Sequence, residues 1–218
     1  MYYPVTQSFN FFNDPQKIID FANSLEFFEG NNRWPGKRTD DIWNFDADLY
    51  QHISLKILSL FYPKGQVSYN YEAEASFQKI TYDDVKMNKG MGWVHDDSMH
   101  KLTAIIYLTP NNTTSGTSIY TPKKTIGALK TPQIKYDYNE GLPIDENDYI
   151  MALNEHNNRF RKVSDFYSEF NSMICFDSNL YHGANFDLKP GEERLTYITF
   201  FKNISAPYYP IVESSTIL

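Results

Sequence analysis

Three polar side chains in this sequence have the types and the spacing of a metal site. His95 and Asp97 stand two residues apart, and a third candidate ligand, His182, follows much later in the chain. Alternate residues of an extended segment point the same way, so His95 and Asp97 can bind one ion together. Two imidazoles and one carboxylate leave the opposite face of a metal open, which is the donor set of non-haem Fe(II) oxygenases.

A cation follows the third candidate ligand. Arg194 opens a run of aromatic and β-branched residues, and Thr196 lies on the same face of the strand that this run predicts. A guanidinium that enters the interior is costly unless it is paired. Together with a hydroxyl it can hold the far carboxylate of 2-oxoglutarate in a two-pronged salt bridge. The alternative is an arginine that starts the strand in solvent.

Other interpretations of these residues stay open. His100 is a competing ligand, and His95-Asp96 could belong to an HD-type phosphohydrolase, although that family is all-helical and strands are predicted around this segment. The same three ligands could hold zinc in a hydrolase with water as nucleophile, but Arg194 and Thr196 would then have no purpose. A non-catalytic jelly-roll module is a third alternative, which the loss of a ligand would favour. No ligand is lost.

Length and composition place these residues in a single globular domain, residues 1–218. Hydrophobic residues make up 41% of the chain and aromatic residues 17%, which is enough for a sizeable core. The formal net charge of −7 argues against a nucleic-acid substrate. The single cysteine, the lack of a visible signal peptide and the lack of a ~20-residue apolar stretch predict a cytoplasmic protein without membrane association (the host cytoplasm, if a phage encodes it).

The hydrophobic pattern predicts helices first and strands after them. Residues 1–65 are expected to form a helical support, with a helix that begins at Asp14-Pro15. Residues 66–202 are expected to form the core. It begins with a long alternating strand from Val67 to Phe77, followed by a bulge at Gln78-Lys79. This order predicts a mainly β fold with N-terminal helices, a cupin-like jelly roll or double-stranded β-helix.

Two polar segments are candidates for the rim of the site. Residues 121–163 form an insertion between the predicted strand Gly116–Tyr120 and the strand that leads to His182. Long loops of this kind are often lids or binding loops. We therefore expect the insertion to govern substrate choice rather than chemistry, so that shortening it would leave the metal site intact. A basic aromatic loop, residues 33–38, is the second candidate, with an ordinary solvated loop as the alternative.

The order of the motifs resembles that of the 2-oxoglutarate- and Fe(II)-dependent oxygenase superfamily, in particular its prolyl 4-hydroxylase-like members. The resemblance covers about residues 66–202 and rests on five segments: Trp93–Asp97, Leu102–Leu108, Gly116-Thr117, Cys175–His182 and Arg194–Phe201. The basic aromatic loop and the residues around His182 are most similar to an uncharacterised bacterial and phage branch of that superfamily.

The resemblance implies a reaction and a role for each residue. Fe(II) would be bound by the three predicted ligands, and the 5-carboxylate of 2-oxoglutarate by Arg194 with Thr196, Tyr107 and Tyr82. Trp93 would border the substrate mouth, with a core aromatic as the alternative. The enzyme would use O2, with ascorbate as a candidate additional cofactor. It would hydroxylate a C–H bond of a peptidyl (prolyl-type) or small-molecule substrate and release succinate and CO2.

Overall fold

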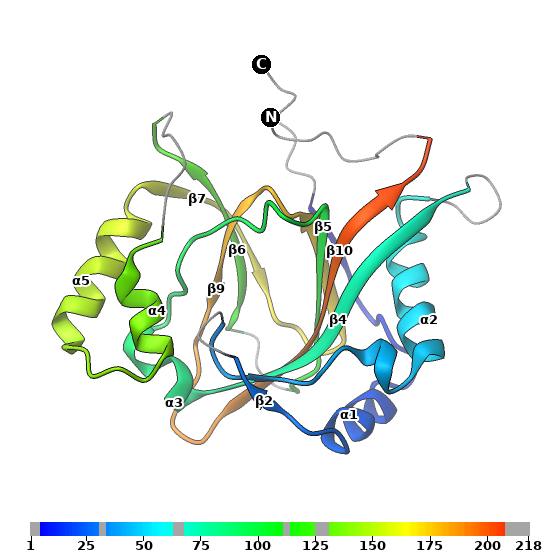
Figure 1. The fold of residues 1–218 in the computed structure, drawn as a ribbon, viewed down its shortest axis with the longest axis horizontal. Coiled ribbons are helices and arrows are strands. Elements are labelled where there is room, and N and C mark those ends of the chain that lie inside the picture. The colour runs from blue at the N-terminus through cyan, green and yellow to red at the C-terminus, as the bar shows by residue number, and fades with distance from the viewer. Residues whose placement is uncertain (1–4, 31–33, 63–67, 111–113, 125–130, 208–218) are drawn as a thin grey trace.

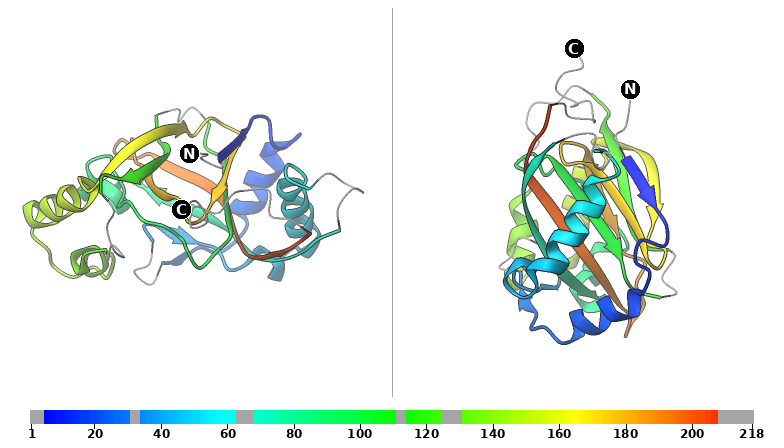
Figure 2. Two further views of the ribbon diagram at one scale, coloured as in Figure 1. Left: turned by 90° about the horizontal axis from the view of Figure 1, so that it is seen from above. Right: turned by 90° about the vertical axis from the view of Figure 1, so that its right-hand side faces the viewer.

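Two antiparallel β-sheets that face each other form the body of the computed structural model, which describes residues 5–30, 34–62, 68–110, 114–124 and 131–207 (Figure 1; Figure 2, left). The larger sheet has the strand order β1-β8-β5-β10-β4-β3-β2, and the smaller sheet has the order β7-β6-β9. The strands are β1 (Val5–Ser8), β2 (Phe28–Glu29), β3 (Lys37–Arg38), β4 (Asn70–Thr81), β5 (Leu102–Tyr107), β6 (Gly116–Pro122), β7 (Phe160–Tyr167), β8 (Ser172–Asp177), β9 (Tyr181–Asn185) and β10 (Glu193–Ser205).

The smaller sheet gains a further edge from the segment before the predicted metal ligands. Isolated antiparallel bridges join Met91 to Asn185 and His95 to His182, so residues 91–95 run beside β9. Two facing sheets closed in this way are the layers of a double-stranded β-helix. The predicted fold class, a mainly β jelly roll with N-terminal helices, is confirmed.

Helices cover the outer face of the larger sheet and one end of the molecule. They are α1 (Pro15–Asn23), η1 (Ile42–Asn44), α2 (Ala47–Leu58), α3 (Tyr82–Val85), η2 (Lys86–Asn88), α4 (Gln133–Asn139) and α5 (Glu146–Asn157). The Asp46 side chain caps α2 by accepting a hydrogen bond from Leu49 N. Buried Ile53 and Ile57 of α2 then pack against the sheet in the main hydrophobic core (Figure 2, right). Within the described ranges, no helix has both the length and the apolar character needed to span a membrane.

The long pair β4 and β10 corrects the predicted bulge. Residues 73–81 of β4 pair with residues 193–201 of β10 in unbroken register, and the irregularity lies at Phe201/Asn203 on the other strand. The alternation slips at Gln78-Lys79 because the end of β4 is buried on both faces. Phe77 packs under the helices, whereas Gln78 and Ile80 line a cavity between the sheets. Gln78 on this second buried face interrupts the alternation of apolar and polar residues in the same way that a bulge would.

Two segment predictions also need correction. Residues 1–65 supply β1, β2 and β3 to the larger sheet in addition to helices, and the predicted strand start at Val67 lies outside the described residues.

The insertion is bounded by β6 and β7, which pair with each other. Its described residues form α4 and α5, so a helical pair joins two strands of the smaller sheet. The insertion was expected to extend to residue 163, so it included the beginning of β7, and this strand was not predicted.

Gly36 is required by the close approach of β3 to β4, and we predict that Gly36→Ala lowers the melting temperature. Its φ of +72° disfavours any side chain, and an added Cβ would press against the backbone oxygen of Lys79. The left-handed conformation alone costs roughly 1–2 kcal/mol, or about 2–8 °C in a domain of this size. Gly141→Ala is the matched control, because Gly141 has a φ of +69° with nothing near its Cβ position. Thermal melts should show the larger loss at Gly36, and equal losses would contradict the packing argument.

Candidate metal centre and cavity

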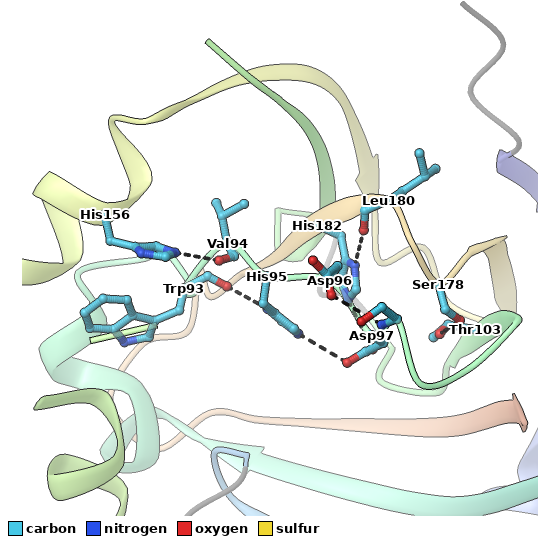
Figure 3. A network of polar contacts seen from close by, with 11 residues as sticks. Trp93, Val94, His95, Asp96, Asp97, Thr103, His156, Ser178, Leu180 and His182 are labelled. Atoms are coloured by element: carbon cyan, nitrogen blue, oxygen red, sulfur yellow. Dashed lines mark hydrogen bonds and ion pairs between the residues drawn. The ribbon is translucent and has the colours of Figure 1, made fainter. Parts of the chain in front are cut away.

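The three predicted metal ligands lie together (Figure 3), and all three line a cavity between the sheets. Ligand atoms of His95, Asp97 and His182 all lie within 4.8 Å of one another. The Nε2 atom of His182 is 3.4 Å from Oδ2 of Asp97, and the Nε2 atom of His95 is 4.0 Å from Oδ1. The competing candidate, His100, is not in this cluster. Its ring stacks on Phe200 instead.

Backbone hydrogen bonds hold the ligands in place. The N–H of His95 donates to the carbonyl of His182 at 2.9 Å, and the N–H of His182 donates to the carbonyl of His95 at 2.7 Å. The N–H of Asp97 donates to the carbonyl of Ser178 at 2.8 Å. Backbone contacts to β9 and to the turn after β8 thus fix ligands that are distant in sequence.

Both histidines present the same ring nitrogen to the cluster. The Nδ1 atom of His95 lies 2.8 Å from the carbonyl oxygen of Trp93, and that of His182 lies 2.8 Å from the carbonyl oxygen of Leu180. A carbonyl oxygen can only accept, so each Nδ1 carries the hydrogen. In the neutral ring this leaves the Nε2 lone pair, on the side of Asp97, free for a metal. Metal-binding histidines are oriented in the same way.

The ionisation states also suit a metal. Burial, followed by the nearby charges of His182 and Lys135, lowers the pKa of His95 to about 3. Burial of Asp97 would raise its pKa, but the hydrogen bond and charge of His182, together with His95, outweigh burial and hold this pKa well below the usual range. At neutral pH the His95 imidazole is therefore uncharged and Asp97 is a carboxylate, the forms in which both bind metals.

Helix α5 fastens the segment that leads to His95. The Asn157 amide accepts from Val94 N at 3.0 Å and donates to the carbonyl of Gly92 at 2.9 Å. The Nε2 atom of His156 lies 2.7 Å from the carbonyl oxygen of Val94 (Figure 3). The insertion therefore supports the metal site directly. The sequence analysis expected a shortened insertion to leave the metal site intact; these contacts lead us to predict instead that shortening it disturbs the site.

Trp93 is a core aromatic that also lines the cavity, and its place at a substrate mouth stays a prediction. Its side chain is buried, its Nε1 donates to the hydroxyl of Tyr149 at 2.9 Å, and the two rings meet edge to face at 5.6 Å. It also lines the cavity. Trp93 is thus a core aromatic whose exposed edge forms part of the cavity wall.

The cavity, of about 140 Å³, extends from the metal ligands to Arg194. Alternate residues of β10 line it: Arg194, Thr196, Ile198 and Phe200. The intervening Leu195 and Tyr197 pack in the core below. The predicted inward direction of Arg194 and Thr196 is therefore found in the structure.

Arg194 is a buried cation without a counter-ion. Its side chain is 6% exposed. Its Nη1 donates to the carbonyl of Asn185 at 3.3 Å, and its Nε has no partner. Among the described residues, no carboxylate forms an ion pair with it. Burial lowers its pKa, but an arginine stays charged in proteins. Such a charge calls for an anion that the chain does not provide.

The two tyrosines predicted beside Arg194 lie in different places. Tyr107 is buried near Arg194, shares a 2.8 Å hydrogen bond with the hydroxyl of Thr117, and has its pKa raised by burial. Thr117 itself lines the cavity. Tyr82 begins α3 and packs beside the cluster that contains Phe186. Neither tyrosine is among the residues that line the cavity. Tyr107 contacts the lining residue Thr117, whereas the structure gives no support to a cosubstrate role for Tyr82.

Several cavity residues were missed or left undecided by sequence reasoning. Gln78 was concealed by the slip in the strand pattern, and Lys135 and Asn139 lie one turn apart on one face of α4. Of the basic aromatic loop, Arg38 lines the cavity, Lys37 is exposed and paired with Glu29, and Arg33 lies outside the described residues. The alternation along β3 was too short to be read as a strand.

Comparisons with known proteins agree on the fold. A model of a family of unknown function, DUF6445, matches residues 3–201. No curated protein shows significant sequence similarity to the chain.

Solved structures with the same fold include three of recorded chemistry. HygX from Streptomyces hygroscopicus, with nickel, 2-oxoglutarate and hygromycin B bound, has a TM-score of 0.57 at 12% identity, over 91% of this chain and 83% of that one. SnoN, a non-haem α-ketoglutarate-dependent epimerase from nogalamycin biosynthesis, has a TM-score of 0.55 at 12% identity, over 91% and 78%. A prolyl hydroxylase from Trichoplax adhaerens, with a peptide fragment of hypoxia-inducible factor, has a TM-score of 0.50 at 13% identity, over 91% and 83%.

We predict that His95→Ala and His182→Ala each weaken the binding of one divalent ion per chain while the fold persists. Each change removes a direct ligand, so the loss should exceed the 10–100-fold cost of removing a partner that only orients a ligand. His100→Ala is the control and should bind the ion as the wild type does. Calorimetric titration with Zn(II) measures all three. Unchanged affinity in both ligand variants, or loss in His100→Ala, would refute the assignment.

Asn157→Ala should weaken metal binding without touching a ligand. The change removes two hydrogen bonds to the segment before His95, each worth about 0.5–1.5 kcal/mol, so the melting temperature should also fall. Asn154→Ala, on an exposed position of the same helix, is the matched control. If the two variants titrate Zn(II) with equal affinity, α5 does not support the metal site.

Proposed function

We propose that this chain, which belongs to the family of unknown function DUF6445, is a 2-oxoglutarate- and Fe(II)-dependent oxygenase. The observation that carries the proposal is the buried, unpaired Arg194 in the same cavity as the His95–Asp97–His182 cluster. A metal-binding face at one end and a fixed cation at the other match a ligand with two acidic ends. 2-Oxoglutarate is such a ligand, since it can chelate a metal through one end and present a carboxylate at the other.

The residues fit the groups that this function requires. Two imidazoles and one carboxylate on one side of an ion leave its other side open, as in Fe(II) sites. The iron and the cosubstrate supply the activation of O2 and the oxidising chemistry when they are bound. The protein contributes binding, orientation and the exclusion of water.

Several side chains that line the cavity, and Tyr107 behind one of them, have a defined part in that contribution. Arg194 pairs with the 5-carboxylate through its fork of N–H groups, and the Thr196 hydroxyl adds a donor on the same face of β10. The Tyr107 hydroxyl stays protonated and holds Thr117 by their shared hydrogen bond. Apolar walls, among them Ile198, Trp93 and Phe186, keep water away from the reacting groups.

The reaction that we propose is oxidation of a C–H bond, by hydroxylation, in a small molecule or a peptide, with release of succinate and CO2. HygX is recorded with hygromycin B and the Trichoplax enzyme with a peptide, so both substrate classes occur on this fold. SnoN is an epimerase, which makes epimerisation the related outcome to examine in product analysis.

The same buried cation favours this function over the two alternatives. A zinc hydrolase requires the three metal ligands and a water molecule, but it has no use for an unpaired arginine at the far end of the cavity. A non-catalytic jelly roll would have no reason to keep both the ligand cluster and an uncompensated charge. Zn(II) binding alone therefore does not distinguish the candidates, whereas 2-oxoglutarate binding does.

We predict that Arg194→Ala weakens 2-oxoglutarate binding by about tenfold to several hundredfold, because hydrogen bonds between charged groups contribute roughly 1.5–3 kcal/mol each. Arg194→Lys should restore part of the affinity, since an ammonium keeps the charge but not the fork. Calorimetry on Zn(II)-loaded protein measures the cosubstrate, and Zn(II) affinity in the same variants serves as the control. Wild-type 2-oxoglutarate affinity in Arg194→Ala, or no binding by the wild type, would overturn the proposal.

A further inference from the structure

We infer that Arg38 and Lys135 form an anion-binding subsite beside the metal ligands, and that the substrate to be oxidised carries a carboxylate or phosphate group that binds there. The inference rests on the proposed function, because it assigns the part of the cavity that the metal and 2-oxoglutarate leave free.

The charge balance of the cavity is the first argument. Its lining includes three cations, Arg38, Lys135 and Arg194, and one carboxylate, Asp97. The positive charges of a divalent metal and of Arg194 are balanced by the negative charges of Asp97 and of the doubly negative cosubstrate. The charges of Arg38 and Lys135 are left without partners. Two uncompensated cations in a partly desolvated cavity favour a further anion.

Arg38 is held so that its N–H edge is available. It pairs with Gln78 across β3 and β4, and both side chains line the cavity. Its guanidinium carbon lies 4.2 Å from the ring centre of Trp34 and 5.6 Å from that of Phe200. The group therefore lies over two aromatic rings, and its Nε is buried without a hydrogen-bond partner. A planar fork held in this way recognises a planar oxyanion.

Lys135 approaches from the insertion. It lies on α4, one turn before Asn139, and both line the cavity. Burial lowers its pKa, and the charge of Asp97 opposes this shift. The same carboxylate also acts on Arg38, where burial lowers the pKa to about 10. Both cations line the same cavity as His95 and Asp97, where the reacting part of a substrate must lie.

The two cations also come from the two parts of the chain that border the cavity outside the jelly-roll strands. Arg38 belongs to the β2–β3 hairpin at the edge of the larger sheet, and Lys135 belongs to the helical insertion in the smaller sheet. No described carboxylate lies within ion-pair distance of either side chain. Both cations lie near aromatic rings, which leave their charges uncompensated.

Binding of matched probes to Mn(II)-loaded protein tests the subsite. Benzoate, phenyl phosphate and benzamide share a ring and differ in the head group, so they separate a carboxylate, a phosphate and an uncharged amide. N-oxalylglycine occupies the cosubstrate site during the titration. Line broadening of each probe by the paramagnetic ion reports both affinity and proximity to the metal. We expect benzoate or phenyl phosphate to bind at least about tenfold more tightly than benzamide.

Charge-removing variants locate the interaction. Arg38→Gln and Lys135→Gln should each weaken binding of the preferred anion about tenfold or more, while Lys37→Gln should not. Lys37 is the neighbour of Arg38 on β3, is exposed, and pairs with Glu29 at 2.9 Å, so the control removes an equal charge outside the cavity. Lys135 lies on a short surface helix, so its variant tests the subsite even where Arg38→Gln fails to fold.

Three results would overturn the inference. They are equal affinity for the anions and benzamide, equal behaviour of Arg38→Gln and Lys37→Gln, and a loss of N-oxalylglycine affinity in Arg38→Gln, which would assign Arg38 to the cosubstrate. Failure of the proposed function gives a different pattern. The wild type would then not bind N-oxalylglycine, while anion binding to the Mn(II)-loaded protein would still report on Arg38 and Lys135.

Discussion

The reciprocal hydrogen bonds between the backbones of His95 and His182 are the constraint on which this site depends. They join residues 91–95 to β9 and bring two imidazoles side by side from distant parts of the chain. Each ring is then oriented by a carbonyl two residues before it. Helix α5 holds the same segment from the other side through Asn157 and His156. The insertion thereby supports the chemistry as well as the cavity wall.

Electrostatics explain the rest of the cavity. Burial of Arg194 without a protein carboxylate is unfavourable for folding, and binding of an anion offsets that cost. The neutral imidazole of His95 and the ionised Asp97 form the opposite end, which is suited to a cation. Arg38 and Lys135 add positive charge beside that end. We propose that the cavity uses these charges to hold a metal, a ligand with two acidic ends and a second anionic group.

Local spacing was enough to predict the parts of the site that lie on regular strands. His95 and Asp97, and likewise Arg194 and Thr196, share a face because side chains alternate in extended chains. The strands β1 and β7, the burial of Gln78 and the place of Lys135 could not be predicted, since each depends on which distant segment lies opposite. Tyr82 was misplaced for the same reason, because α3 begins where the sequence analysis continued a strand. Spacing indicated that Arg194 and Thr196 could bind a carboxylate of 2-oxoglutarate, and the family resemblance added the predicted roles of Tyr107 and Tyr82.

A crystal structure of the protein grown with Zn(II) and 2-oxoglutarate tests the central claim most directly, since Zn(II) replaces Fe(II) without redox chemistry. The account predicts an anomalous peak within about 2.0–2.2 Å of Nε2 of His95, Nε2 of His182 and the Asp97 carboxylate. It also predicts the far carboxylate of 2-oxoglutarate at about 2.7–2.9 Å from the Arg194 guanidinium. A metal bound elsewhere, or a cosubstrate carboxylate that makes no contact with Arg194, would contradict it.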